Sequence, residues 1–485
     1  MNQKELEKYL WGAATSLRGT IDAGDYKQFI FPLLFFKRIC DAYDEEFEKA
    51  LAISDGDEEY ATFTENHHFQ IPKESHWNSV REVTVNVGMA IQEAMRSIEK
   101  ANPKLLTGIF GDASWTNKER LSDEILINLI EHYSKYALNL SNVPDDQLGS
   151  AYEYLIKKFA DDSGHTAAEF YTNRTVVKLM TMLMDPKPGE SVYDPTCGSG
   201  GLLLNCALHL KDNDEEYRSL KLYGQEINLI TSAIARVNMF VHGIEEFNIV
   251  QGDTLTNPSF IENDKLKKFN VILANPPYSI KSWDQKGFEN DPYGRNIWGT
   301  PPKGCADYAF QQHIQKSLND SNGRYAILWP HGILFREKEA AIRRKMIKDD
   351  TVEAVICLGA NLFYNSPMES MILVGNTNKP KERKGKVLFV NAKDDIFENK
   401  GLAFLSQAHI DKIYTAYKKF ENIANYAKVA TLEEILSLNA DMNINFYVDR
   451  NSTKKHHSFP DEFDDWIKSS SKLNKSIVDI FKLIN

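Results

Sequence analysis

The 485-residue sequence predicts an α/β protein in which an all-α N-terminal region precedes a mostly parallel, Rossmann-like sheet with an antiparallel last strand. Three patterns support this fold class. Apolar residues recur at helical spacing through residues 1–150, and short β-branched segments alternate with amphipathic ones through residues 151–448. An apolar stripe at spacings of three and four then predicts a helical tail over residues 449–485.

The helical region begins with two amphipathic segments that carry charged residues on their opposite sides. Their apolar positions are Leu6, Leu10, Ala13, Ala14 and Leu17, followed by Phe29, Leu33, Leu34, Phe36 and Ile39. A third amphipathic helix is predicted over residues 121–136. The charged, aromatic-rich stretch 55–77 is predicted to be a loop.

The sheet is predicted from a series of β-branched segments that end in turn residues. They cover residues 191–194, 221–225, 248–252, 270–274, 324–329, 352–358, 368–374 and 386–390. Amphipathic helices are expected at 229–242, 306–319 and 337–348. This alternation favours parallel strands that are covered on both faces. The short polar loop 376–386 predicts that the last two strands pair with each other antiparallel.

The composition excludes several classes of protein. Hydrophobic residues make up 42% and charged residues 26% of the chain, as in ordinary soluble globular proteins, and the length predicts more than one domain. The five cysteines are scattered without a CxxC pair or a Cys/His cluster, so neither a zinc site nor a disulfide framework is expected. The polar N-terminus predicts no signal peptide, and the apolar run 29–36 is too short to span a membrane. A reducing cytoplasm is the expected location.

The formal net charge of −11 bears on any role in nucleic-acid binding. A protein that held DNA by itself would usually present a basic surface, so local contacts or a partner subunit would have to supply the positive charge. Two basic clusters could touch phosphates, one at 379–386 and one formed by Arg336, Arg343 and Arg344. We interpret the first as a solvated loop and leave the second open.

A glycine-rich turn follows the first predicted strand and opens a helix. It reads Asp194-Pro195-Thr196-Cys197-Gly198-Ser199-Gly200-Gly201. Glycines are needed where the backbone approaches a ligand closely or takes a positive φ, and the following helix presents unpaired N–H groups. The pattern differs from the Gly-x-Gly-x-x-Gly of dinucleotide sites, and the Asp194 carboxylate suits a cationic amino-acid group. The turn thus indicates a nucleoside-like cofactor, with a ligand-free strand-to-helix turn as the alternative.

Acidic residues also end the next two predicted strands, at Glu226 and Asp253. A carboxylate at Glu226 can accept both hydroxyls of a ribose, and one at Asp253 can accept from an adenine amine. Each by itself could be a solvated carboxylate or a helix cap. Ligands of open α/β sheets bind outside the carboxyl ends of the strands, where Asp194, Glu226 and Asp253 are all expected.

The tetrapeptide Asn275-Pro276-Pro277-Tyr278 follows the strand 270–274. Its prolines stiffen the backbone, so the Asn275 side-chain oxygen and the Pro276 carbonyl can accept the two hydrogens of a planar amine. This localises the nitrogen lone pair and aims it at a sulfonium methyl group, a reaction that needs positioning and electrostatics rather than a strong base. The ring of Tyr278 could stack on a base taken out of the duplex. A plain Asn-Pro turn with a core tyrosine is the alternative.

In this order the two motifs predict methylation of an amino group by S-adenosyl-L-methionine, most directly N6 of adenine in DNA. An amide acceptor argues against methylation at carbon 5 of cytosine, where a cysteine nucleophile is expected. Phe170, Tyr171 and Thr172 could wall the methionine end of the cofactor site, or form a helix-entry turn. Two other functions stay open, namely methylation of a glutamine amide in a protein and a scaffold without turnover.

Together these residues resemble the modification (HsdM-type) subunit of type I restriction-modification systems, an N6-adenine DNA methyltransferase family, over nearly the whole chain. Besides the two motifs, the resemblance rests on residues 10–14, 17–19, 29–40, 151–156, 223–226, 238–239, 242–243, 252–255, 306–310, 330–335 and 361–364. The segment 151–156 is similar to the family's linker into the catalytic domain. The chain departs from the family pattern at two places that bear on the shape of the pocket. Asn173 stands where family members typically have a proline, and Gly359-Ala360 precedes Asn361 where Leu-Pro-Ala or a similar sequence is usual.

The resemblance implies partners. Two such subunits would join one specificity subunit in an M2S1 complex on double-stranded DNA, and a restriction (motor) subunit would complete the nuclease. Sequence reading by another chain would account for the acidic net charge. The C-terminal stripe, which includes Phe463, Trp466 and Ile467, would then dock on the specificity subunit. Packing of this stripe on its own domain stays open.

Overall fold

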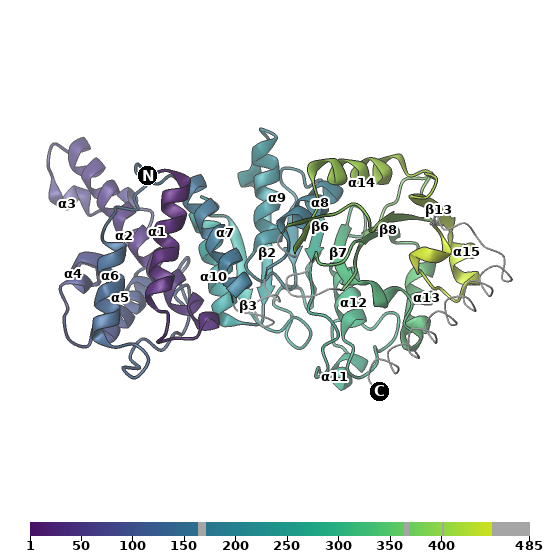
Figure 1. Ribbon diagram of the computed structural model, residues 1–485, viewed down its shortest axis with the longest axis horizontal. Coiled ribbons are helices and arrows are strands. Elements are labelled where there is room, and N and C mark those ends of the chain that lie inside the picture. Colours follow the sequence, from purple (N-terminus) through teal and green to yellow (C-terminus); the bar gives the residue numbers. More distant parts are fainter. Residues whose placement is uncertain (163–170, 363–367, 400–401, 449–485) are drawn as a thin grey trace, which may run out of the picture.

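The computed structural model describes residues 1–162, 171–362, 368–399 and 402–448. Helices form the first part of the chain, and a nine-stranded sheet with helices on both faces forms the second (Figure 1). The expected fold class is therefore confirmed. The tail predicted at 449–485 lies outside the described residues. Within the described ranges, no helix combines the length and the apolar character that crossing a membrane requires.

The helical part is built from seven helices within residues 1–162. They are α1 (Gln3–Ser16), α2 (Lys27–Ile53), α3 (Glu58–Ala61), α4 (Trp77–Arg81), α5 (Val87–Ala101), α6 (Asp123–Tyr133) and α7 (Asp145–Asp162). The sequence starts α1 with a capping box, since Asn2 Oδ1 accepts from the Glu5 amide at 3.0 Å and Glu5 accepts from the Asn2 amide. The stretch predicted as loop contains α3 and two short 3-10 turns, Thr64–Asn66 and Lys73–Ser75.

The second part alternates strands and helices as predicted. Its strands are β1 (Ser191–Asp194), β2 (Lys221–Glu226), β3 (Phe247–Gln251), β6 (Val271–Ala274), β7 (Arg324–Pro330), β8 (Val352–Leu358), β9 (Ser370–Asn376), β10 (Lys386–Ala392) and β13 (Ala427–Thr431). Its helices are α8 (Arg174–Met184), α9 (Gly201–Asp212), α10 (Leu229–Val241), α11 (Gln285–Glu289), α12 (Asp307–Ser317), α13 (Ala340–Lys348), α14 (Gln407–Lys419) and α15 (Leu432–Ser437). Two small hairpins, β4 (Ile261–Glu262) with β5 (Lys265–Leu266) and β11 (Phe397–Asn399) with β12 (Leu402–Phe404), stand apart from the sheet.

The strands of the large sheet follow the order β13-β10-β8-β9-β7-β6-β1-β2-β3. In the described sheet β9 runs antiparallel to β7 and β8, β13 runs antiparallel to β10, and the other pairs are parallel. The expected pairing of the strand at 368–374 with the strand at 386–390 is wrong, because β8 lies between β9 and β10.

The loop between β9 and β10 explains this error. Its Lys379 is only 3% exposed, and Nζ donates to Asp350 at 2.6 Å and to the carbonyls of Val352 and Lys386 at 3.0 and 2.7 Å. The lysine therefore holds the loop across the start of β8. A hairpin between β9 and β10 would instead have reversed direction at this loop and placed the two strands side by side. The interpretation of 379–386 as a solvated loop is also wrong for Lys379 and for Arg383, which pairs with Glu353 at 3.2 Å.

Alternate residues of the central strands serve two separate apolar cores. Leu273 and Leu328 pack with α8, α9 and α14, whereas Ile272 and Ile327 pack with α12 and α13 on the other face. Figure 1 shows these two groups of helices on opposite sides of the sheet. Both faces need apolar side chains, which is why a strand such as β6 is buried at every position.

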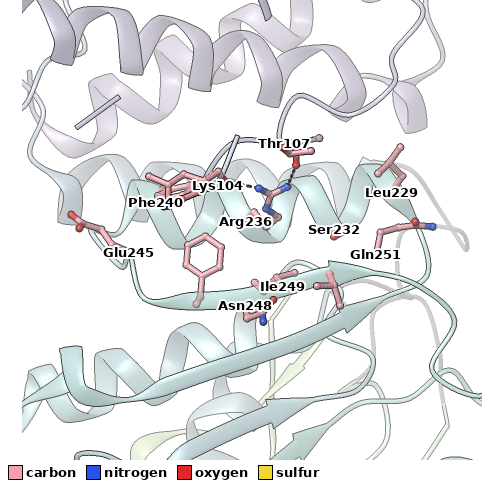
Figure 2. Close-up of a pocket in the computed structure, with 14 residues that line it drawn as sticks. Lys104, Thr107, Leu229, Ser232, Arg236, Phe240, Glu245, Asn248, Ile249 and Gln251 are labelled. Carbon is pink, nitrogen blue, oxygen red and sulfur yellow. Dashed lines mark hydrogen bonds between the residues drawn. The ribbon is translucent and has the colours of Figure 1, made fainter. Parts of the chain in front are cut away.

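Helix α10 belongs to the sheet and to the helical part at once. Its Ile234, Val237 and Val241 are part of the core that α1, α2 and α7 build. Arg236 points from α10 toward the loop at Thr107, and its guanidinium donates to the carbonyls of Thr107 and Leu105 at 2.6 Å each (Figure 2). The two parts of the chain are therefore packed against each other by a shared core and by direct hydrogen bonds.

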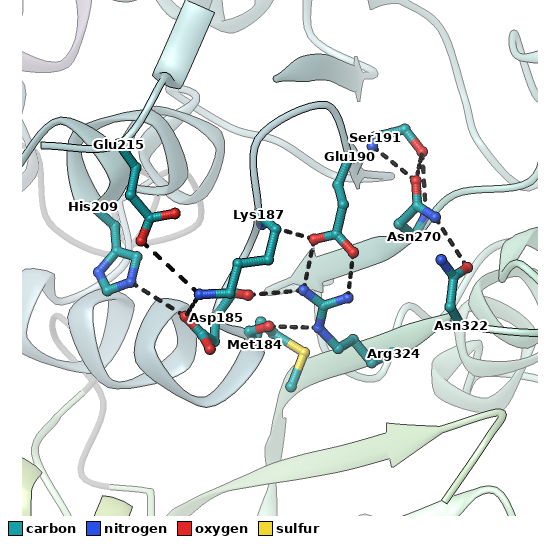
Figure 3. Close-up of polar contacts among 10 residues, drawn as sticks. All are labelled: Met184, Asp185, Lys187, Glu190, Ser191, His209, Glu215, Asn270, Asn322 and Arg324. Atoms are coloured by element: carbon teal, nitrogen blue, oxygen red, sulfur yellow. Dashed lines mark hydrogen bonds and ion pairs between the residues drawn. The ribbon is translucent and has the colours of Figure 1, made fainter. Parts of the chain in front are cut away.

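A network of hydrogen bonds and ion pairs lies at the amino ends of the central strands (Figure 3). Arg324, the first residue of β7, makes a two-pronged ion pair with Glu190 at 2.7 and 2.8 Å. The same guanidinium donates to the carbonyls of Met184 and Asp185 at the end of α8, at 2.5 and 2.9 Å. This arginine thus ties α8 to β7 at the edge of the sheet opposite the predicted functional residues.

Replacing Arg324 should destabilise the fold. In Arg324→Ala the Glu190 carboxylate and two carbonyls lose their donor in a site where both side chains are at most 20% exposed. We expect the free energy of unfolding to fall by about 1–3 kcal/mol, measured by urea denaturation. Lys187→Ala is the matched control, because Lys187 pairs with Asp185 on the surface and should matter by less than about 1 kcal/mol. Equal losses in the two variants would contradict this account.

Candidate active site

Four polar residues singled out in the sequence lie in one row along the carboxyl edge of the sheet. Asn275 follows β6, Asp194 ends β1, Glu226 ends β2 and Asp253 follows β3, and these four strands are consecutive neighbours. Because parallel strands present their carboxyl ends at the same edge, the residues come together although Asn275 lies 81 positions after Asp194 in the sequence. This edge is the candidate active site.

The glycine turn is shaped by two different demands. Gly198 and Gly200 have φ of +52° and +79°, in the left-handed region that favours glycine. A Cβ on Gly201 would lie 1.9 Å from Arg174 Nη1, so this glycine makes room for a guanidinium rather than for a turn. The turn is also held from outside, because Asn238 Nδ2 donates to the Ser199 carbonyl at 3.0 Å.

Asp194 is almost fully buried, and its Oδ1 accepts from the Thr196 amide at 3.0 Å. Burial raises the pKa of its carboxyl to about 8, and the neighbouring Glu226 carboxylate acts in the same direction. Glu226 accepts from the Gly198 amide at 3.0 Å and from the Asn228 amide at 2.9 Å, so it holds the turn against the start of α10. A buried carboxyl of this kind favours a cationic ligand.

A small cavity lies between the glycine turn and the loop that begins at Asn275. Its lining consists of Thr172, Arg174, Asp194, Thr196, Cys197, Gly198, Ser199, Gly201, Leu202 and Asn275. Glu226 reaches this lining through Gly198, whereas Asp253 is not part of it and accepts from the Leu255 amide at 2.9 Å. Tyr171 is buried next to Arg174, whose guanidinium lies 4.8 Å from the ring centre. Phe170 lies outside the described residues.

Three residues of this region were missed by the sequence reasoning. Arg174 forms an ion pair with Glu153 of α7, and Asn238 Nδ2 donates to the other Glu153 oxygen at 2.8 Å. One signal was available, because an arginine in the first turn of α8 is disfavoured by the positive end of the helix and indicates a tertiary partner. The segment 151–156, which resembles a linker, lies inside α7, with Leu155 and Ile156 in the helical core.

In the catalytic loop, both ends of the Asn275 amide are hydrogen-bonded. Its Nδ2 donates to Thr172 Oγ1 at 3.0 Å, and its Oδ1 accepts from the Tyr278 hydroxyl. Thr172 lines the cavity and also contacts the Asn275 amide. Pro276 is buried behind these groups and Pro277 is half-buried.

The backbone after Tyr278 is held by a buried ion-pair cluster. Ser279 has φ of +50°, and its amide donates to Asp307 Oδ1 at 2.7 Å. Arg336 forms ion pairs with Asp307 and with Glu339. These ion pairs account for an arginine at this position without any contact to a DNA phosphate. Cys305, Asp307 and Glu339 offer three groups of metal-binding type within 4.8 Å of one another, although no metal site was expected from the sequence. Arg336 already supplies positive charge to both carboxylates there.

Comparisons with known proteins identify the family of this chain. Residues 143–456 match the model of the N-6 DNA Methylase family, and residues 6–133 match that of the HsdM N-terminal domain. The methylase subunit of the type I restriction enzyme MjaVII from Methanocaldococcus jannaschii is 30% identical, with 94% of this chain and 80% of the relative covered. The HindI methylase subunit from Haemophilus influenzae is 31% identical, with 75% of this chain and 86% of the relative covered.

A solved structure shows the same relationship. The crystal structure of the type I restriction-modification system methyltransferase subunit from Streptococcus thermophilus superposes with a TM-score of 0.80 at 29% identity. The match covers 93% of this chain and 100% of that one. The chain belongs to the family of type I restriction-modification methylase (HsdM-type modification) subunits, and it is an adenine-specific DNA methyltransferase.

Proposed function

We propose that the chain transfers a methyl group from S-adenosyl-L-methionine to N6 of an adenine that has been flipped out of double-stranded DNA. The observation that supports this most directly is the cavity that Asn275 shares with Asp194 and the glycine turn. A cofactor held by the turn and an amine held by Asn275 would meet in this cavity. Proximity of this kind accounts for much of the rate when no strong base is needed.

The charges of the cavity fit the amino-acid end of the cofactor. Asp194 would hold the ammonium group, and Arg174 would hold the carboxylate, since its Nε is buried without a hydrogen-bond partner among the described residues. Glu226 would accept from the ribose hydroxyls and Asp253 from the adenine amine. When bound, the cofactor supplies an electrophilic methyl group on a sulfonium. The cofactor site would further include Phe170, Tyr171, Thr196, Gly198, Ser199, Gly200 and Gly201, whereas the Thr172 hydroxyl accepts a hydrogen bond from Asn275.

The target amine would take the place of the Tyr278 hydroxyl on Asn275 Oδ1. The Pro276 carbonyl would accept its second hydrogen, and Pro277 keeps this carbonyl in a fixed direction. Burial raises the pKa of the Tyr278 phenol far above its ordinary value, so Tyr278 stays protonated and cannot act as a base. Its ring would instead stack on the adenine, next to the Trp329 ring at 6.3 Å between centres.

Target recognition would require partner chains. We propose an M2S1 complex with a specificity subunit, which a restriction subunit can join, because the relatives are methylase subunits of type I restriction enzymes. The net charge of −11 supports this, because another chain would then supply most of the contacts to the DNA phosphates. Residues 1–150 would serve assembly, residues 151–448 catalysis, and the tail 449–485 docking on the specificity subunit. The DNA substrate would place the complex in the cytoplasm.

Asn275→Ala should abolish methyl transfer and leave cofactor affinity within about threefold, because the amide serves the amine and not the cofactor. Asp194→Ala is the counterpart and should weaken cofactor binding by about ten- to hundredfold, the value of a hydrogen bond to a charged group. Transfer is measured by sequencing N6-methyladenine in the host genome, which keeps all partner chains present. Binding is measured by calorimetry on the purified chain. Normal genomic methylation in the Asn275→Ala strain would refute the proposal that Asn275 holds the target amine.

Cofactor binding should depend on pH through Asp194. Its carboxyl, with a pKa of about 8, is protonated near neutral pH, and an ammonium beside it lowers that pKa. Binding must then release a proton, so affinity should rise with pH up to the pKa of about 8 of the free protein, by at most about tenfold per unit. Calorimetry in buffers of different ionisation enthalpy measures the proton released. Asp194→Asn should release none, and a wild-type affinity that does not change with pH would contradict the assignment.

A further inference from the structure

The two ends of the Asn275 amide are chemically different. The oxygen only accepts hydrogen bonds and the nitrogen only donates them. An adenine amine that offers its hydrogens must therefore meet Oδ1, and the productive orientation leaves the two N–H groups of Nδ2 on the other side. Asn275 is half-buried, so a donor without an acceptor there would carry a desolvation cost.

Thr172 supplies the missing acceptor. Its Oγ1 accepts from Asn275 Nδ2 at 3.0 Å across 103 residues of sequence. The Tyr278 hydroxyl lies on the opposite end of the amide, at the oxygen, and is the group that the substrate amine would replace. Thr172 is thus the contact that stays when the substrate is bound.

The backbone at Thr172 is fixed on both sides. Tyr171 is buried before it, and the buried Asn173 follows it as the N-cap of α8. Asn173 Oδ1 accepts from the Thr175 amide at 3.0 Å, and its Nδ2 donates to the Ala403 carbonyl at 2.9 Å. This asparagine, a departure from the family pattern, therefore anchors the neighbouring Thr172 to the small hairpin of β11 and β12.

We propose that Thr172 is a positioning residue that holds the Asn275 amide with its oxygen toward the substrate amine. This rests on the proposed function, since it assumes that Asn275 holds the amine. It differs from the expectation that Thr172 walls the cofactor, because the hydroxyl acts through Asn275 and its loss would slow the transfer step without weakening cofactor binding.

The test compares Thr172→Val, Thr172→Ala and Thr172→Ser in the full chain, purified from the host with the subunits that accompany it. Thr172→Val keeps the shape and removes the acceptor, and we expect kcat at saturating S-adenosyl-L-methionine to fall about ten- to hundredfold. The dissociation constant of the cofactor, from calorimetry, should stay within about threefold. Thr172→Ala should behave like Thr172→Val, and Thr172→Ser should restore most of the rate. Thr181→Val, a matched change of a buried threonine in α8 outside the cavity lining, should leave kcat unchanged.

The possible results separate this inference from the proposed function. If Thr172→Val weakens cofactor binding and keeps kcat at saturation, Thr172 is a wall of the cofactor site and the inference is wrong. It is also wrong if Thr172→Ser is as slow as Thr172→Val, since the hydroxyl would then not be the active feature. Asn275→Ala is measured in the same assay. If that variant still transfers methyl groups, the proposal that Asn275 holds the amine is itself wrong. If Asn275→Ala is inactive but the Thr172 variants match the wild type, Asn275 keeps its proposed role and Thr172 is not a positioning residue.

Discussion

The cavity between the glycine turn and Asn275 depends on the carboxylate of Glu153, which belongs to the helical part of the chain. This carboxylate is ion-paired with Arg174 and accepts from Asn238, and Asn238 in turn holds the carbonyl of Ser199 in the glycine turn. A buried guanidinium without its partner is costly, so Arg174 can line the cavity only because α7 brings a negative charge to it. The helical region is thus a structural part of the candidate active site.

The two edges of the sheet have opposite characters. At the amino edge, Arg324 satisfies Glu190 and two carbonyls, and this contributes to stability. At the carboxyl edge, a buried carboxyl with a raised pKa and an asparagine held by two hydroxyls face a shared cavity. The buried carboxyl of Asp194 is unfavourable for folding until a ligand satisfies it, which is why perturbed pKa values gather at functional sites.

Local patterns in the sequence were sufficient to predict the strands and the residues at their ends. Asp194, Glu226 and Asn275 follow short apolar segments whose length and composition predict strands, and parallel pairing then brings them to one edge. Contacts between distant segments could not be predicted in this way. The position of β8 between β9 and β10 depends on the reach of Lys379, and the pairing of Glu153 with Arg174 depends on how two helices pack. The contact between Thr172 and Asn275 likewise arises only after folding.

The hydroxyl of Tyr278 on Asn275 Oδ1 has a thermodynamic consequence for base recognition. The Asn275 oxygen already accepts a hydrogen bond from Tyr278 before DNA arrives, so an adenine amine that replaced this hydroxyl would exchange one hydrogen bond for another and add little to ground-state affinity. The balance changes as the methyl group is transferred, because the amine becomes cationic and a hydrogen bond from a charged donor is stronger than one from a neutral hydroxyl. In the proposed function Asn275 would therefore discriminate between the transition state and the bound base, and the affinity that keeps the base out of the duplex would have to come from stacking and from contacts to the DNA backbone.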